Sequence, residues 1–283
     1  MSDPQLTADQ RLALIWLKVE RVEKHLIEFE RERTAFLATK PYRVREKPDA
    51  KHVYEACHVT DVPGALAAIA GDAIQNLRSA LDHLVSQLVL VGLGVSTTDI
   101  ESHFPIRNKA GQYESVLRGM KEKGLLRQDA FDLLLDVQAY IGGNCGNFWL
   151  LNRLNNIDKH RIILTAGSAL RSVNIGALMS RLMREHAREA EAAREAAGEA
   201  PWPYAAADIP ALNAFFRPAD NLRPLKVGDT LFTGGDMDPE KDFAFDIAFN
   251  EPEILEGEAV LETLKHLAEL VRTIIAQFKP SLA

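Results

Sequence analysis

The 283-residue sequence has only two cysteines, Cys57 and Cys145, and neither is flanked by a partner at metal-ligand spacing. Two cysteines cannot build a disulfide framework, and their scarcity favours a reducing compartment such as the cytoplasm. The N-terminus lacks a basic start followed by an apolar stretch, so no signal peptide is expected. No run approaches the roughly 18 apolar residues of a membrane span. The sequence therefore predicts a cytoplasmic protein with no membrane partner.

A basic excess is also missing, because the formal net charge is −7 and the pI is near 5.7. This balance argues against a broad, sequence-independent nucleic-acid surface, although a local basic groove remains compatible with it. The sequence contains no Walker loop, no Gly-x-Gly-x-x-Gly after a strand, no His-Glu-x-x-His and no Gly-x-Ser-x-Gly. The usual sequence support for most large enzyme classes is therefore absent, and no cofactor is expected.

Helical periodicity is the strongest pattern present. Thr7 and Gln10 form a capping box, and the apolar stripe after them predicts a helix over 8–38 that ends before Pro41. Further helices are predicted at 63–91, 127–140, 147–160, 177–199 and 257–278. The Ala/Glu/Arg-rich helix at 177–199 has no apolar face beyond His186, so we expect it to project into solvent. The stretch 95–124 is expected to be a loop with one short helix.

Strand patterns concentrate after residue 160. Two strands are predicted around Gly167, and two more at 225–233 and 241–250. Residues 51–60 alternate loosely, and this pattern is compatible with one further strand. The strand 241–250 places four apolar side chains on one face: Phe243, Phe245, Ile247 and Phe249. The predicted fold class is mainly α (α+β), an antiparallel bundle of about five helices with a small antiparallel sheet inserted before the C-terminal helix. The expected parts are a bundle at 1–160, a β-containing insertion at 161–256 and a returning helix at 257–283.

Two dense polar clusters lie on predicted helices. The candidate catalytic residues of the first cluster are Asn76, Arg78, Asp82 and His83. The residues of the second cluster are Arg153, Asn156, Asp158, His160 and Arg161. Both helices are expected in one bundle, so we predict that the clusters lie close together.

The residues Asn76 to Leu84, together with Ile157-Asp-Lys-His-Arg161, resemble the paired signature of an uncharacterised family of bacterial proteins. That family brings no known activity. The spacing Arg78-x4-His83 is also similar to the Arg-x(4–6)-His motif of HEPN domains, which are helical bundles and often metal-independent RNA endonucleases. This chain has Ser79 directly after the arginine, where that group commonly has Asn, Asp or His. The resemblance implies RNA as a partner, and a homodimer in which Arg and His from two protomers meet.

The chemistry implied by this resemblance is coherent. Cleavage of RNA without a metal needs a base for the 2′-hydroxyl and a cation for the phosphate. His83 is expected to be the acid or base, Arg78 the bidentate phosphate clamp and Asn76 a substrate-orienting residue on the same helical face as His83. However, Arg153-x6-His160 and Arg181-x4-His186 satisfy the same spacing, so the motif alone does not decide.

Two other classes stay open. In the first, the chain is a non-catalytic binding or dimerisation module, Arg78 and Asp82 are an exposed helix ion pair, and Asp158 caps backbone or holds His160. In the second, it is a metal-dependent hydrolase. The residues that offer oxygen and nitrogen ligands for that class are Asp82, His83, His103, Asp158 and His160. No two histidines stand at i, i+4, and no metal site is assigned.

Overall fold

The computed structural model describes residues 6–160, 166–200, 206–210, 212, 214–216, 224–251 and 254–283. The chain forms two compact units, and each is described by itself. Unit 1 comprises residues 1–34, 63–166 and 249–283, and unit 2 comprises residues 35–62 and 167–248. Residues 35–62, which the sequence pattern assigned to the bundle, thus belong to the second unit.

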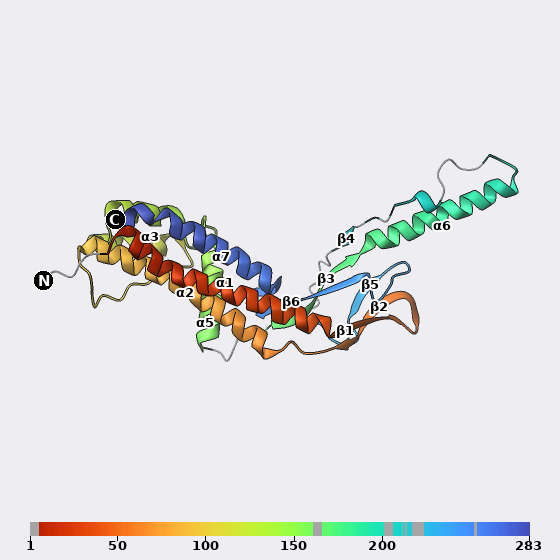
Figure 1. The fold of residues 1–283 in the computed structure, drawn as a ribbon, viewed down its shortest axis with the longest axis horizontal. Coiled ribbons are helices and arrows are strands. Elements are labelled where there is room, and N and C mark those ends of the chain that lie inside the picture. The colour runs from red at the N-terminus through yellow and green to blue at the C-terminus, as the bar shows by residue number, and fades with distance from the viewer. Residues whose placement is uncertain are drawn as a thin grey trace. The chain divides into compact units, whose positions relative to one another are not determined.

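Unit 1 is helical. Its long helices are α1 (Ala8–Ala38), α2 (Gly64–Leu93) and α7 (Val260–Gln277), which lie side by side (Figure 1). The bounds of α1 match the predicted 8–38, and the capping box forms. The Thr7 N–H donates to Gln10 Oε1 at 2.8 Å, and the Gln10 N–H donates to Thr7 Oγ1 at 3.3 Å.

The C-terminal helix packs on the first two helices, as predicted. Helix α7 contacts α2, and ion pairs join it to α1: Arg272 pairs with Glu23, and Lys265 Nζ lies 3.7 Å from Glu30 Oε2. Helix α5 (Asn147–His160) packs against α2 as well. Apolar side chains that are fully buried on α2, among them Ile74, Leu77, Leu81 and Leu84, form the centre of this core.

Two shorter helices, α3 (Ala110–Glu122) and α4 (Gln128–Val137), complete the unit. The described part of unit 1 therefore holds six α-helices rather than about five. Helix α3 has thirteen residues and occupies a stretch predicted to be mainly loop. Helix α7 begins at Val260 rather than at 257, because residues Leu255–Ala259 form strand β7. Strand pairing depends on distant residues, so the local helical pattern did not reveal it.

Two small sheets occur among the described residues instead of one. The first has the order β1-β2-β5, formed by Tyr42–Lys47, Ala50–Val59 and Thr230–Thr233, and its pairs are antiparallel. Strand β2 confirms the strand expected at 51–60, whereas β1 was not predicted. Because both strands precede α2, strands are not confined mainly to the residues after 160. The second sheet has the order β4-β3-β6-β7, with β3 at Ala166–Asn174, β4 at Phe215–Phe216 and β6 at Phe243–Glu251.

The second of the two strands predicted around Gly167, which begins at Leu170, is confirmed as part of β3. Gly167 itself lies inside β3, so the predicted break at this glycine is wrong. The first of the two predicted strands falls mostly on 161–165, outside the described residues. Strand β6 matches the predicted 241–250, but Asp246 and Ala248 are also buried, at 6% and 2% exposed. Both faces of this strand are therefore partly covered, whereas the alternation indicated one solvent face.

An aromatic and aliphatic core holds unit 2 together. Tyr42 of β1 contacts Phe245 of β6 with ring centroids 5.1 Å apart, and Tyr54 of β2 contacts Phe243 at 5.6 Å. Helix α6 (Ile175–Ala196) follows β3 directly and matches the predicted 177–199 to within three residues at each end. None of the helices in the described ranges combines the length and the apolar character needed to cross a membrane.

Candidate functional site

Arg78 of α2 holds the backbone of the loop after that helix. Its Nη2 donates to the Phe104 carbonyl at 3.0 Å and lies 3.0 Å from Asp82 Oδ1, and that oxygen accepts the Phe104 N–H at 2.8 Å. The Arg78 side chain is 10% exposed. Burial lowers the pKa of Arg78 below its usual value, Arg107 adds to this effect, and Asp82 opposes it. The predicted pairing of Arg78 with Asp82 is thus present, but it is buried and not on an exposed helix face.

The other two residues of the first cluster lie elsewhere around α2. His83 is exposed, and partial desolvation of its ring together with Lys18 lowers its pKa, while Asp82 raises it. Asn76 Nδ2 donates to the Asp72 carbonyl one turn earlier at 2.8 Å. Arg78 and His83 are five residues apart, about 140° around a helix, so their side chains diverge within this chain. The geometry gives no common site for the two in a single protomer.

The second cluster lies on α5, which packs against α2. The Asp158 carboxylate lies directly over Gly71, because a Cβ built at Gly71 would fall 2.3 Å from Asp158 Oδ1. Burial raises the pKa of Asp158, and the nearby charge of Asp72 raises it further. The two polar helices are therefore in contact, although the distance between His83 and His160 is not defined, because the His160 side chain and Arg161 lie outside the described residues.

Arg153 and Asn156 of the same helix are exposed. The Arg153 guanidinium carbon lies 5.8 Å from the centroid of the Trp149 ring, in cation–π contact. Trp149 Nε1 donates to Asn108 Oδ1 at 2.8 Å. This arrangement joins α5 to the loop that Arg78 holds, and it leaves Arg153 at the surface.

The predicted metal ligands lie on α2, on α5 and in the loop after α2. Within the described ranges, no three His, Cys, Asp or Glu side chains converge in a way that could hold an ion. Among the predicted ligands, His103 Nδ1 lies 3.7 Å from Asp82 Oδ2, and the His103 side chain is 71% exposed. The hydrolase class gains no geometric support from this part of the chain.

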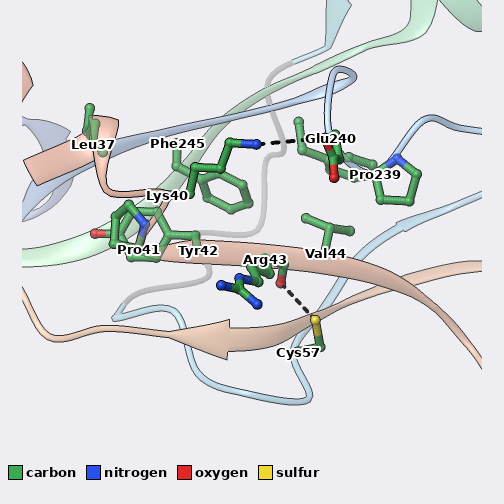
Figure 2. Close-up of a pocket in the computed structure, with 11 residues that line it drawn as sticks. Leu37, Lys40, Pro41, Tyr42, Arg43, Val44, Cys57, Pro239, Glu240 and Phe245 are labelled. Atoms are coloured by element: carbon green, nitrogen blue, oxygen red, sulfur yellow. Dashed lines mark hydrogen bonds and ion pairs between the residues drawn. The ribbon is translucent and has the colours of Figure 1, made fainter.

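Unit 2 contains a pocket that the sequence analysis did not identify. Its volume is about 580 Å³, and Figure 2 shows side chains from the end of α1, from β1 and from β6 around it. The aromatic wall includes Tyr42 and Phe245, and the cations Lys40 and Arg43 lie at its edge. Only a tertiary contact between β1 and β6 creates this space, so no local pattern could have indicated it.

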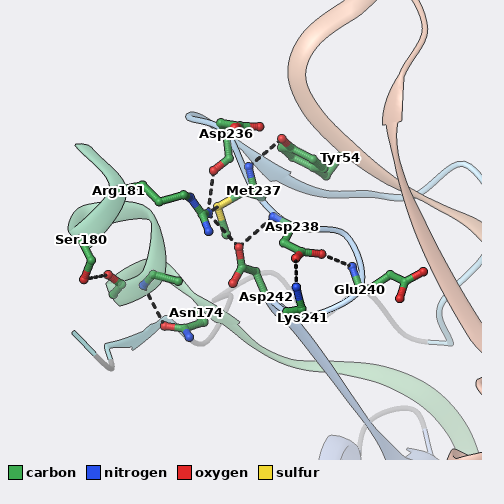
Figure 3. A network of polar contacts seen from close by, with 12 residues as sticks. Tyr54, Asn174, Ser180, Arg181, Asp236, Met237, Asp238, Glu240, Lys241 and Asp242 are labelled. Carbon is green, nitrogen blue, oxygen red and sulfur yellow. Dashed lines mark hydrogen bonds and ion pairs between the residues drawn. The ribbon is translucent and has the colours of Figure 1, made fainter. Parts of the chain in front are cut away.

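Helix α6 is anchored at its start by a polar network, shown in Figure 3. Arg181 Nη2 donates to the Asp236 carbonyl at 2.7 Å and to Asp242 Oδ2 at 2.8 Å. Asp242 is 4% exposed, and the same oxygen accepts the Asp238 N–H at 2.8 Å. Asn174 Oδ1 caps the helix by accepting the Ala177 N–H at 3.2 Å. The first two turns of α6 are thus fixed to the rest of unit 2.

One side of α6 is covered by the segment that returns along it. The Ala206 N–H donates to Glu191 Oε1 at 3.1 Å, and Arg184 donates to the Ile209 carbonyl at 3.1 Å. Another side carries three large apolar side chains in contact with solvent: Met179, Leu182 and Met183, which are 49%, 44% and 47% exposed. The expectation that the helix projects fully into solvent is therefore correct for only part of its circumference.

Comparison with protein-family models, curated proteins and solved structures found no match to this chain.

Proposed function

We propose that this chain is a non-catalytic binding protein that forms a homodimer through the exposed apolar side of α6. The observation that carries the proposal is the cluster Met179, Leu182 and Met183 on a helix whose base is fixed by Arg181 and Asp242. Large apolar side chains left exposed together at i, i+3 and i+4 on a rigid helix are typical of an interaction surface. Strand β4 contacts α6, and its Phe215 is 64% exposed.

The spacing along α6 fits a second copy of the same helix. Five residues follow one another at steps of four, three, four and three, which is the heptad spacing of a two-helix seam: Met179, Met183, His186, Ala190 and Ala193. The alanines permit close approach of two helices but bury little area. The association should therefore be modest, with a dissociation constant of roughly 10–100 µM, equivalent to about 5.5–7 kcal/mol.

Charges beside this seam favour a parallel pair. If Met183 and Ala190 take the a positions, Glu189 is a g residue and Arg194 is the e residue five positions later. In a parallel dimer each Glu189 then faces Arg194 of the other copy, which gives two opposite-charge pairs. Within its own chain Arg194 already donates to the Ala200 carbonyl at 2.9 Å and lies 3.5 Å from Glu199 Oε2, so Glu189 of the other copy would compete with or add to these partners.

The burial and the hydrogen bonds of Arg78 favour a non-catalytic role over the expected ribonuclease activity. The guanidinium that would bind phosphate instead bonds Phe104 and Asp82, and it is almost fully buried. Releasing it would leave the Asp82 carboxylate and a backbone carbonyl without their partner. Binding of a phosphate by Arg78, which the predicted ribonuclease site requires, is therefore incompatible with the bonds that Arg78 makes to Phe104 and Asp82.

The test is the concentration dependence of mass, measured by sedimentation equilibrium. The wild-type chain should pass from monomer to dimer with rising concentration, and Leu182→Glu with Met183→Glu should keep it monomeric. Val227→Glu replaces a residue that is 64% exposed elsewhere in unit 2, and it should leave the dimer intact.

A charge swap tests the parallel arrangement. Glu189→Arg should weaken the dimer, and adding Arg194→Glu should restore it. A chain that stays monomeric at about 1 mM contradicts the proposal.

A second candidate is association with RNA, favoured by the stacked Arg153 and Trp149 beside Asn108. Aromatic and arginine planes bind unpaired bases, and Arg107 and Lys109 flank Asn108. Binding of single-stranded RNA should weaken as salt rises, and Arg153→Ala should weaken it several-fold while Arg118→Ala does not. RNA affinity that is the same in both variants rules out this surface.

A further inference from the structure

We propose that the pocket of unit 2 binds a small organic anion that has a flat apolar body. The proposal concerns a site distinct from the α6 surface and does not rest on the homodimer. The pocket volume of about 580 Å³ lies in the range that holds metabolite-sized and drug-sized ligands. Its residues come from the last turn of α1 and the turn that follows it, from strands β1 and β2, and from strand β6 with the loop before it (Figure 2).

The pocket wall is suited to a flat apolar body. Tyr42 and Phe245 are in ring contact at 5.1 Å, and Phe243, Leu37 and Val44 extend the apolar surface. Burial raises the pKa of Tyr42 to about 12, and Ser168 opposes that shift, so this phenol stays neutral at physiological pH. An uncharged aromatic wall favours an aromatic or planar ligand through stacking and area burial.

The charges at the edge favour an anion. Lys40 and Arg43 line the pocket beside a single carboxylate, Glu240, so one positive charge is in excess. Lys40 Nζ lies 3.7 Å from Glu240 Oε2, but both side chains are at least 75% exposed, so a ligand can displace this weak pair. Among the described residues, the Arg43 guanidinium has no hydrogen bond or ion pair. It is therefore free to bind a carboxylate through two parallel N–H donors.

Lys40 occupies a backbone position that favours glycine. Lys40 has a φ of 52°, in the left-handed region, and its N–H closes the end of α1 by donating to the Leu37 carbonyl at 3.0 Å. Glycine is the favoured residue at this position, since a side chain adds strain there. Lys40 also lines the pocket, so Lys40→Gly removes a pocket cation and relieves the backbone strain at the same time. Lys40→Gly should thus separate binding from stability.

The experiment measures the binding of 2-naphthoate to the full chain by isothermal titration calorimetry. The neutral 2-naphthylmethanol, of the same shape, serves as the matched ligand. The carboxylate should bind about tenfold more tightly than the alcohol. Arg43→Gln and Lys40→Gly should each weaken naphthoate binding several-fold and leave the alcohol unchanged. Lys226→Gln removes an exposed positive charge of unit 2 outside the pocket and should have no effect.

Two further readouts locate the ligand and guard against misfolding. Cys57 lines the pocket and is partly exposed, whereas Cys145 is buried, so the thiol that reacts with a disulfide reagent should be Cys57 and naphthoate should slow that reaction. Lys40→Gly should unfold at the same or a higher temperature than the wild-type chain. Three outcomes would each overturn the proposal. They are equal affinity for the two ligands, no naphthoate binding at about 1 mM, and a naphthoate affinity that is unchanged in both pocket variants.

Discussion

Arg78 and Asp82 form an ion pair of 3.0 Å that holds a single residue, Phe104, by both of its backbone polar groups. The pair is one helical turn long, but the residue it holds is twenty-two positions beyond Asp82. Helix α2 thereby fixes the start of the segment that leads to α3. Phe104 is 1% exposed, and its ring contacts Phe148 of α5 at 5.6 Å, so the pair also positions an aromatic contact in the core of unit 1.

We predict that Arg78→Ala destabilises the chain by about 3–5 kcal/mol, because it leaves a partly buried carboxylate and a buried carbonyl without their cation. The free energy of unfolding from urea titration measures this loss. Arg118→Ala is the matched control: Arg118 also pairs with a carboxylate one turn away, Glu114, at 3.1 Å, but its side chain is 66% exposed. The control should cost no more than about 0.5 kcal/mol. Equal effects in the two variants contradict a buried structural role for Arg78.

The contact of α5 with α2 at Gly71 gives a second prediction. Gly71→Ala should destabilise the chain by roughly 1–3 kcal/mol, since its Cβ would overlap Asp158 Oδ1. Adding Asp158→Ala should recover most of that loss, because it removes the overlapping carboxylate. Gly64→Ala, where nothing lies within 4 Å of the new Cβ, should be neutral or slightly stabilising. Thermal unfolding of Gly71→Ala, Asp158→Ala, the double variant and Gly64→Ala measures these effects. If the changes in the two single variants simply add in the double variant, the residues do not meet.

Asp158 also predicts a dependence of stability on pH. Its pKa is raised in the folded chain by burial and by Asp72, so the folded state binds this proton more tightly than the unfolded state. The carboxylate therefore lowers stability once the pH rises above its unfolded pKa, near 4, and has no such effect in acid. Asp158→Asn should raise the free energy of unfolding at pH 7 and change it little at pH 3. Asp61→Asn, at an exposed position, is the control and should change the free energy of unfolding by less than about 0.5 kcal/mol. If Asp158→Asn stabilised the chain more at pH 3 than at pH 7, the pH dependence would have the opposite sign, and the folded state would not raise the pKa of Asp158.

The elements that local chemistry determines could be predicted from the sequence. Thr7 and Gln10 form the expected capping box, and the apolar stripe then gave both ends of α1. Strand β7 shows the opposite case, because residues 255–259 carry a pattern compatible with helix and become a strand only through pairing in the sheet β4-β3-β6-β7. Local propensity is weak when a distant strand supplies the hydrogen bonds.

The same limit applies to the candidate site. The spacing of Arg78 and Asp82 correctly indicated a pair, but the burial of that pair depends on Phe104, which no helical pattern places there. The pocket is a stronger example, since Tyr42 and Phe245 are about two hundred residues apart in sequence and their contact creates one wall of it. Residue types could be identified from the sequence, whereas their environment required the tertiary structure.

For RNA, the proposed non-catalytic role predicts that the purified chain does not cleave single-stranded RNA, with a chelator or with Mg²⁺. His83→Ala should change stability by less than about 0.5 kcal/mol, because the side chain is exposed. The outcome that would establish the ribonuclease alternative is equally definite. It is cleavage of RNA but not DNA in chelator, lost in His83→Ala and kept in His186→Ala. Activity that needs a divalent ion would instead favour the metal-dependent class.

The last prediction concerns how α6 is held. Arg181 and Asp242 form a pair of 2.8 Å, and Asp242 is almost fully buried while it also accepts the Asp238 N–H. Arg181→Ala should therefore destabilise unit 2 by about 2–4 kcal/mol, because it leaves an unpaired buried carboxylate at the base of the helix. Hydrogen exchange should show the first turns of α6 opening more often in this variant, since their anchor to Asp236 and Asp242 is gone.

Lys241 provides the control in the same loop. Its Nζ lies 2.8 Å from Asp238 Oδ2, but the lysine side chain is 81% exposed. Lys241→Ala removes a cation as close to its carboxylate as Arg181 is, yet water replaces the lost partner, so the free energy of unfolding should stay unchanged. If α6 orients the proposed dimer, Arg181→Ala should also weaken self-association, and Lys241→Ala should not. Unchanged exchange and unchanged stability in Arg181→Ala would mean that the apolar contacts of Leu178, and not this ion pair, hold the helix.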